Sequence, residues 1–221
     1  MMNNLFSIFD PISIMKLPLN WISIMLMFMF IPKKMFLQMN RINNIINYFN
    51  KLVMNEFSPI LKKNKFMLLP MTFFTIILMN NLMSLPPYIF PTTSHLQLNM
   101  LMSLPTWLSI MMFGWYYHTN HLFCHLVPNN TPLMLMNFMV IIETISNLIR
   151  PLTLMVRLTA NLIAGHLLLS LLSSLKMILS YKSMIMLIMI QMILITLEFS
   201  VAIIQAYVFS LLICLYFMDV N

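Results

Sequence analysis

A row of polar side chains runs along one long apolar stretch of this chain. Its members stand at i, i+4, i+7, i+14 and i+18, which puts them on one face of an α-helix: Glu143, Asn147, Arg150, Arg157 and Asn161. An arginine in the middle of a membrane helix costs roughly 2.5–3.5 kcal/mol on insertion scales, so it faces protein or water and commonly marks an ion pathway. Arg157 is therefore the first candidate for the chemistry of this chain, which would be the control of proton movement.

A second apolar stretch carries polar residues at a spacing of its own. Gln191, Glu198 and Gln205 are seven residues apart and share a helical face. A turn near 176–182, where two lysines stand, would fold the two stretches back on each other. This turn would bring three pairs together: Arg157 with Gln205, His166 with Glu198, and Glu143 with Asp219.

Small residues favour the same pairing. The chain has two glycines and four alanines, and all four alanines lie in these two stretches, as two i, i+4 pairs: Ala160 with Ala164, and Ala202 with Ala206. Close helix approach in lipid relies on small side chains. We therefore expect tight contact here, either between the two helices or against a partner.

The first of these stretches is too long to cross a membrane upright. Residues 132–175 would extend about 66 Å as one helix, at 1.5 Å per residue, whereas a bilayer core is about 30 Å thick. A single helix would have to be steeply tilted or bent, with Pro151 as the natural place for a kink. The alternative is two elements broken near Pro151.

At these residues the chain resembles a known family. Three runs closely resemble subunit a (subunit 6) of mitochondrial F-type ATP synthase, and weaker similarity covers the rest of the chain. The three runs are 141–146 (IIETIS), 156–166 (VRLTANLIAGH) and 205–209 (QAYVF). The resemblance is most specific in the two long apolar stretches that would form the hairpin, and it is looser from about 33 to 64.

The resemblance implies a proton-conducting stator subunit with two offset half-channels against a rotating ring of c subunits. Arg157 corresponds to the family's invariant arginine, which separates the half-channels and drives deprotonation of the ring carboxylate, so that proton flow turns the rotor. His166 and Glu198 match the inlet on the intermembrane side, and Glu143 and Asp219 match the outlet on the matrix side. Two further residues match polar positions close to the arginine: Asn161 and Gln205.

The same resemblance implies the surroundings of the chain. Its expected partners are the c ring, subunit b, subunit 8, membrane lipids and protons, in the mitochondrial inner membrane. No cofactor and no metal are expected. Charge bias puts the basic segment 33–65 on the matrix side, so the N-terminus is expected in the intermembrane space, and five membrane elements then put the C-terminus in the matrix.

Composition independently indicates a membrane protein. The chain has 221 residues, of which 61% are hydrophobic and 8% charged, and a mean hydropathy of +0.89. The net charge of +7 does not indicate nucleic acid binding, because seven of the basic residues lie in one connecting segment, 33–65. With two glycines there is no phosphate-binding loop, so the chain alone is not expected to make or hydrolyse ATP.

These observations predict an all-α membrane protein with about five membrane helices and one interfacial amphipathic helix, forming a single membrane domain over residues 1–221. The last two helices would form a long, steeply tilted antiparallel hairpin. The expected elements are a first span at 12–32, a matrix-surface helix at 40–60, further spans at 66–85 and 99–117, and the hairpin helices at 132–175 and 183–217. Two lysines at the hairpin tip would then lie on the intermembrane side, against the usual charge bias.

Several alternatives stay open. Asn80 and Asn81 lie within a span and suit helix packing better than a proton pathway. Arg150 fits a packing role and an outlet role equally well. His118, His121, Cys124 and His125 have helical spacing, but no acidic partner completes a zinc site, and a polar connection is the better interpretation. A respiratory-chain subunit would carry a buried lysine relay, and a transporter would show internal repeats; the sequence has neither.

Overall fold

The computed structural model describes residues 5–12, 18–25, 41–61, 66–86, 89–117, 119–127, 132, 135–175 and 181–220. Within these residues the regular structure is helical, which confirms the all-α prediction. Short 3-10 helices occur at Leu5–Phe9 (η1), Leu19–Ile22 (η2) and Thr92–Ser94 (η4). The α-helices are Arg41–Phe57 (α2), Leu68–Ser84 (α3), Leu96–Tyr117 (α4), Thr119–His125 (α5), Met136–Leu175 (α6) and Tyr181–Val220 (α7).

Three helices in the described part of the chain are long and apolar enough to cross a membrane. They are α4 with 22 residues, α6 with 40, and the segment Ser183–Met218 of α7 with 36. The shorter helix α3 is also apolar. Most of the first expected span, 12–32, lies outside the described residues; within its described part the chain forms the short helix at Leu19–Ile22.

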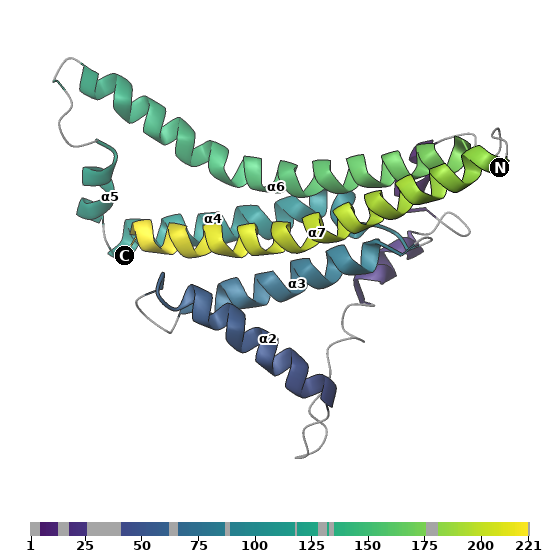
Figure 1. Cartoon of the computed structure of the whole chain (residues 1–221). Helices are drawn as coiled ribbons and strands as arrows, with labels where there is room; N and C mark the ends of the chain where they lie inside the picture. The colour runs from purple at the N-terminus through teal and green to yellow at the C-terminus, as the bar shows by residue number, and fades with distance from the viewer. Residues whose placement is uncertain are drawn as a thin grey trace.

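Helix α7 is the centre of the bundle. It contacts α3, α4 and α6, and α3 and α4 each run beside it (Figure 1). Aromatic rings join these helices: Phe73 lies 5.9 Å from Phe209, and Phe66 lies 5.2 Å from Phe217 and 5.6 Å from Phe113, between ring centroids. The second half of α7 is consequently the buried half, whereas most side chains in its first half are exposed.

Helix α6 is one continuous helix through Pro151. Of the two possibilities that the sequence leaves open, the unbroken helix is the one found. Pro151 is buried, and α6 is bowed, so that its first half rises away from α4 and α7 (Figure 1). A proline removes one backbone hydrogen bond and crowds the preceding turn, which favours bending at this place.

Helix α2 leaves the bundle at an angle (Figure 1). Its second half is anchored, because Phe57 is fully buried and its ring lies 6.1 Å from that of Tyr207 on α7. Apolar side chains elsewhere on the helix are exposed: Ile45 is 69% exposed, and Phe49 and Leu52 are exposed as well. One end of this amphipathic helix therefore packs on protein while the rest presents an apolar face outward.

Candidate functional site

Arg157 lies on an outward face of α6. Its neighbours Leu154 and Leu158 point into the core, and the Arg157 side chain is exposed. Among the residues that the structure describes, no hydrogen bond or ion pair to Arg157 is found. Asn161 and Ala164, at i+4 and i+7 from it, are exposed on the same side of the helix. The chain thus presents a cation, an amide and a small residue together on its outer surface.

The two alanine pairs have different surroundings. Ala202 and Ala206 on α7 are 2% and 0% exposed and belong to the packed interior. Ala160 and Ala164 on α6 are exposed beside Arg157. The pair on α7 therefore packs within this chain. The pair on α6 is left uncovered by this chain.

Helices α6 and α7 approach each other closely at Gly165 and Glu198. A Cβ atom added to Gly165 would overlap the carboxylate oxygen Oε1 of Glu198 and lie 2.9 Å from its Cδ. The antiparallel register predicted from the sequence, which puts His166 near Glu198, therefore holds in this region. His166 and Glu198 are both half-buried, and His166 Nε2 and Glu198 Oε2 are buried without a hydrogen-bond partner in the described part of the chain.

Gln205 does not bond to Arg157, although the sequence places the two opposite each other. Gln205 is 5% exposed, and neither its amide oxygen nor its amide nitrogen has a hydrogen-bond partner among the described residues. Arg157 points outward instead. The Gln205 amide therefore lies inside the chain, and the Arg157 guanidinium lies on its outer surface.

Further buried polar atoms lie at the ends of α3 and α4 and in the connection between them. Only Asn81 among these residues is a candidate from the sequence, because isolated Ser, Thr and His side chains produce no periodic pattern. Asn81 is 0% exposed, and its amide atoms have no partner in the described residues, which does not support the preferred packing role. The others with a buried, unpartnered side-chain atom in that part of the chain are Thr93, His95 and Ser103.

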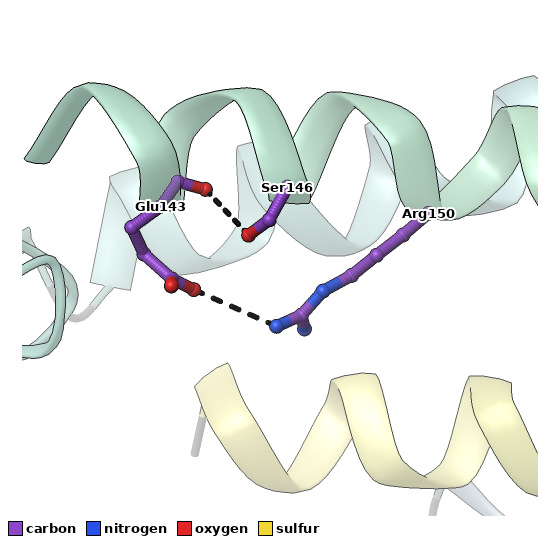
Figure 2. A network of polar contacts seen from close by, with 3 residues as sticks. All are labelled: Glu143, Ser146 and Arg150. Carbon is purple, nitrogen blue, oxygen red and sulfur yellow. Dashed lines mark hydrogen bonds and ion pairs between the residues drawn. The ribbon is translucent and has the colours of Figure 1, made fainter. Parts of the chain in front are cut away.

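A separate polar site lies where the first half of α6 leaves the bundle. Glu143 and Arg150 form an ion pair with 3.6 Å between Oε1 and Nη2, and both side chains are 36% exposed (Figure 2). The Arg150 guanidinium carbon lies 5.6 Å from the centre of the Tyr216 ring on α7. A cavity of about 570 Å³ opens beside them, lined by Glu143, Asn147, Arg150, Tyr216 and the side chains of Trp107 and Trp115, among others.

The remaining sequence candidates are only partly described. Asp219 belongs to the last turn of α7, but its side chain lies outside the described residues, so the expected approach to Glu143 is not tested. The histidines around α5 are not tested either, because His118 and the side chains of His121 and His125 lie outside the described residues. In the part that is described, no three His, Cys, Asp or Glu residues come together to hold a metal ion.

The geometry separates two places where protons could be exchanged. Glu198 and His166 form one, and Glu143 beside its cavity forms the other. Along α6, Arg157 lies between them, about 14 Å from His166 and about 21 Å from Glu143 at 1.5 Å per residue. A carboxylate or imidazole can bind and release a proton, whereas an arginine keeps its charge at any ordinary pH. The arrangement therefore has titratable groups at two places and a fixed cation between them.

Comparisons with known proteins agree along the whole length. The family model of the ATP synthase A chain matches residues 15–218. ATP synthase subunit a of Locusta migratoria is 51% identical over 224 residues, and that of Drosophila melanogaster is 49% identical over 224 residues, in each case over 100% of both chains. The protein of the same name from Aedes aegypti is 48% identical over 226 residues, again over 100% of both chains.

Proposed function

Because this chain belongs to the family of ATP synthase subunit a, the proton-conducting stator subunit of the Fo sector, we propose that it guides protons through two offset half-channels that meet at Arg157. The chain is a non-catalytic component of the ATP synthase complex and a membrane protein homologous to the mitochondrial subunit. The proposal concerns which residues carry the proton and how the chain faces its rotor.

One observation carries this proposal: Arg157 is exposed on a face shared with Asn161 and Ala164. An arginine at that depth needs an electrostatic partner, and within the described residues the chain supplies none. A ring of c subunits, each with a carboxylate, would supply it. Small side chains at Ala160 and Ala164 would let that ring approach the backbone of α6 closely.

The cation would control the proton on the ring. A positive charge within about 4–6 Å stabilises the ionised form of a carboxylate, so a ring subunit passing Arg157 would release its proton. The same charge would repel a proton moving directly from one half-channel to the other. Each proton carries about 2.3 kcal/mol per 100 mV of membrane potential, and forcing it around the ring would convert that energy into rotation.

The inlet would be built around Glu198 and His166, with Gln205 leading toward Arg157. Buried polar atoms without a protein partner support this assignment, because such atoms are costly unless water satisfies them. Asn81, Thr93, His95 and Ser103 also carry buried side-chain atoms without a hydrogen-bond partner among the described residues, so we include them in the inlet. The outlet would run past Glu143 and its cavity, with Asp219 near its end.

We further propose the orientation that the charge bias favours. The basic segment containing α2 would lie on the matrix surface, with its exposed apolar residues in the membrane interface. The N-terminus would then lie in the intermembrane space and the C-terminus in the matrix of mitochondria. Helices α6 and α7, with 40 residues each, would cross the inner membrane obliquely. Subunit b and subunit 8 would be the neighbouring stator subunits.

The test is an Arg157→Ala substitution in the assembled ATP synthase, with Arg157→Lys as the charge-retaining control. We expect Arg157→Ala to abolish proton-driven ATP synthesis while the complex still assembles, because the side chain is not part of the packed interior. Arg157→Lys should retain more synthesis than Arg157→Ala. Coupled synthesis at the normal rate in the alanine variant would overturn the proposed role.

A second measurement separates this function from that of a self-contained channel. The purified chain, reconstituted into vesicles without the c ring, should not conduct protons, because Arg157 would block the direct route. Adding the c ring should restore potential-driven proton flux. Conduction by the chain alone, at a rate comparable to the complex, would favour a channel or transporter instead.

A further inference from the structure

Arg150 stands at the place where α6 separates from the rest of the bundle. Its side chain and that of Glu143 point from α6 in the direction of α7, and they approach one another across two turns of the helix (Figure 2). Both residues line the cavity of about 570 Å³ between the first half of α6 and helices α4, α5 and α7. The ion pair is therefore part of the cavity wall.

Arg150 makes contacts on two helices. Its Nη2 atom is 3.6 Å from Oε1 of Glu143 on its own helix, and its guanidinium carbon is 5.6 Å from the centre of the Tyr216 ring on α7. A guanidinium at this distance from a ring is attracted to the ring face. Arg150 thus links Glu143, on the first half of α6, to Tyr216, on the second half of α7.

We propose that Arg150 is a positioning residue for proton release, which holds the Glu143 carboxylate at the cavity and fixes its place relative to α7 through Tyr216. This inference rests on the proposed function, in which Glu143 belongs to the outlet. It decides between the two roles that the sequence leaves open for Arg150, packing and outlet, in favour of the outlet.

The geometry of the ion pair suits positioning better than stabilisation. At 3.6 Å the two atoms are farther apart than in an ordinary N–H···O hydrogen bond of about 2.7–3.2 Å, and the carboxylate is accessible to water. Both side chains are 36% exposed. Ion pairs with such exposure contribute little to folding. Loss of Arg150 should consequently change proton flux more than it changes the amount of assembled subunit.

A double-mutant cycle tests the proposal in the assembled complex. Proton-driven ATP synthesis is measured for Arg150→Gln, Glu143→Gln and the double variant, together with the amount of assembled subunit. We expect Arg150→Gln to slow synthesis about two- to tenfold, which is the lower part of the range that coupling between contacting residues commonly produces. In the Glu143→Gln background the same change should have no further effect, because there is no carboxylate left to position.

Matched variants guard against a simple loss of folding. Arg150→Lys keeps the charge and should restore most of the rate. Tyr216→Phe keeps the aromatic face and should retain more synthesis than Tyr216→Leu. Ser146→Ala is the control, because the Ser146 hydroxyl donates to the backbone carbonyl of Glu143 at 2.8 Å and its removal leaves the ion pair in place.

The outcomes separate this inference from the proposed function. Equal slowing by Arg150→Gln with and without the Glu143 carboxylate would mean a packing role and would overturn the inference. A normal rate in Arg150→Gln, with a slow rate in Glu143→Gln, would overturn it as well while leaving Glu143 in the outlet. A normal rate in Glu143→Gln would remove both residues from the pathway but would leave the Arg157 result standing.

Discussion

Gly165 on α6 lies directly against the carboxylate of Glu198 on α7, at a point where no Cβ atom would fit without moving that carboxylate. This is one of two glycines in the chain. A helical glycine costs about 1 kcal/mol relative to alanine, so its presence inside α6 calls for a structural reason. The space that it leaves for Glu198 is that reason.

Gly165→Ala should therefore reduce proton flux although alanine is the better helix former. The added methyl group would displace the Glu198 carboxylate, while the helix itself would be slightly stabilised. The measurement is potential-driven proton flux per assembled complex. Shortening the acid in the double variant Gly165→Ala/Glu198→Asp should recover part of the lost flux; a double variant slower than either single variant would contradict this explanation.

Glu198→Gln should slow proton flow without opening a leak. Glutamine has nearly the same shape as glutamate but cannot bind and release a proton. Arg157 would still separate the half-channels, so flux should fall while vesicles containing the complex keep their potential when the rotor is blocked. Unchanged flux would remove Glu198 from the inlet, and a new leak would mean that this residue also helps to close it.

Replacing an alanine with leucine should cause different defects at the buried Ala206 and at the exposed Ala164. Ala206 is 0% exposed, so Ala206→Leu should overpack the interior and destabilise the chain by about 1–3 kcal/mol. Ala164 is exposed on the Arg157 face, so Ala164→Leu should leave the subunit folded and instead weaken its contact with the c ring. The amount of folded subunit and its recovery with the c ring distinguish the two defects. Identical behaviour of both variants would argue against an outward-facing ring contact.

Phe57→Ala should lower the stability of the chain by about 3–5 kcal/mol, the usual cost of removing a buried aromatic ring. Phe57 is 0% exposed and anchors α2 against Tyr207 of α7. Ile45→Ala is the control on the same helix, since Ile45 is 69% exposed and such changes commonly stay within about 0.5 kcal/mol. Thermal unfolding of the purified subunit in detergent measures both. Equal stability of the two variants would show that α2 is not held by this ring.

The sequence predicts the helical fold because its strongest signals are local. Apolar runs and helical spacing are properties of neighbouring residues, and they lead correctly to an all-α chain whose last two long helices touch. The antiparallel register near Gly165 and Glu198 was also accessible, because a short turn leaves few ways to pair two regular helices. The continuity of α6 through Pro151 was not, since bulk packing on both sides decides whether a proline bends a helix or ends it.

The sequence does not predict which residues far apart along the chain pack against each other. Nothing in the residues around Phe57 or Phe73 indicates that their partners are Tyr207 and Phe209, far along the chain. The sequence also does not indicate three buried polar residues in and beside the connection between α3 and α4: Thr93, His95 and Ser103. The roles assigned to the charged residues remain predictions for the experiments above.

The outward direction of Arg157 has a consequence for how the complex is put together. Before another protein covers that face, the guanidinium must stay hydrated within a membrane, at a cost of roughly 2.5–3.5 kcal/mol on insertion scales. An isolated copy of this chain is thus less stable in the membrane than the assembled one. Its half-life in the cell should depend on how soon a carboxylate-bearing neighbour binds to it. The residue proposed to direct protons would in this way also report whether assembly has been completed.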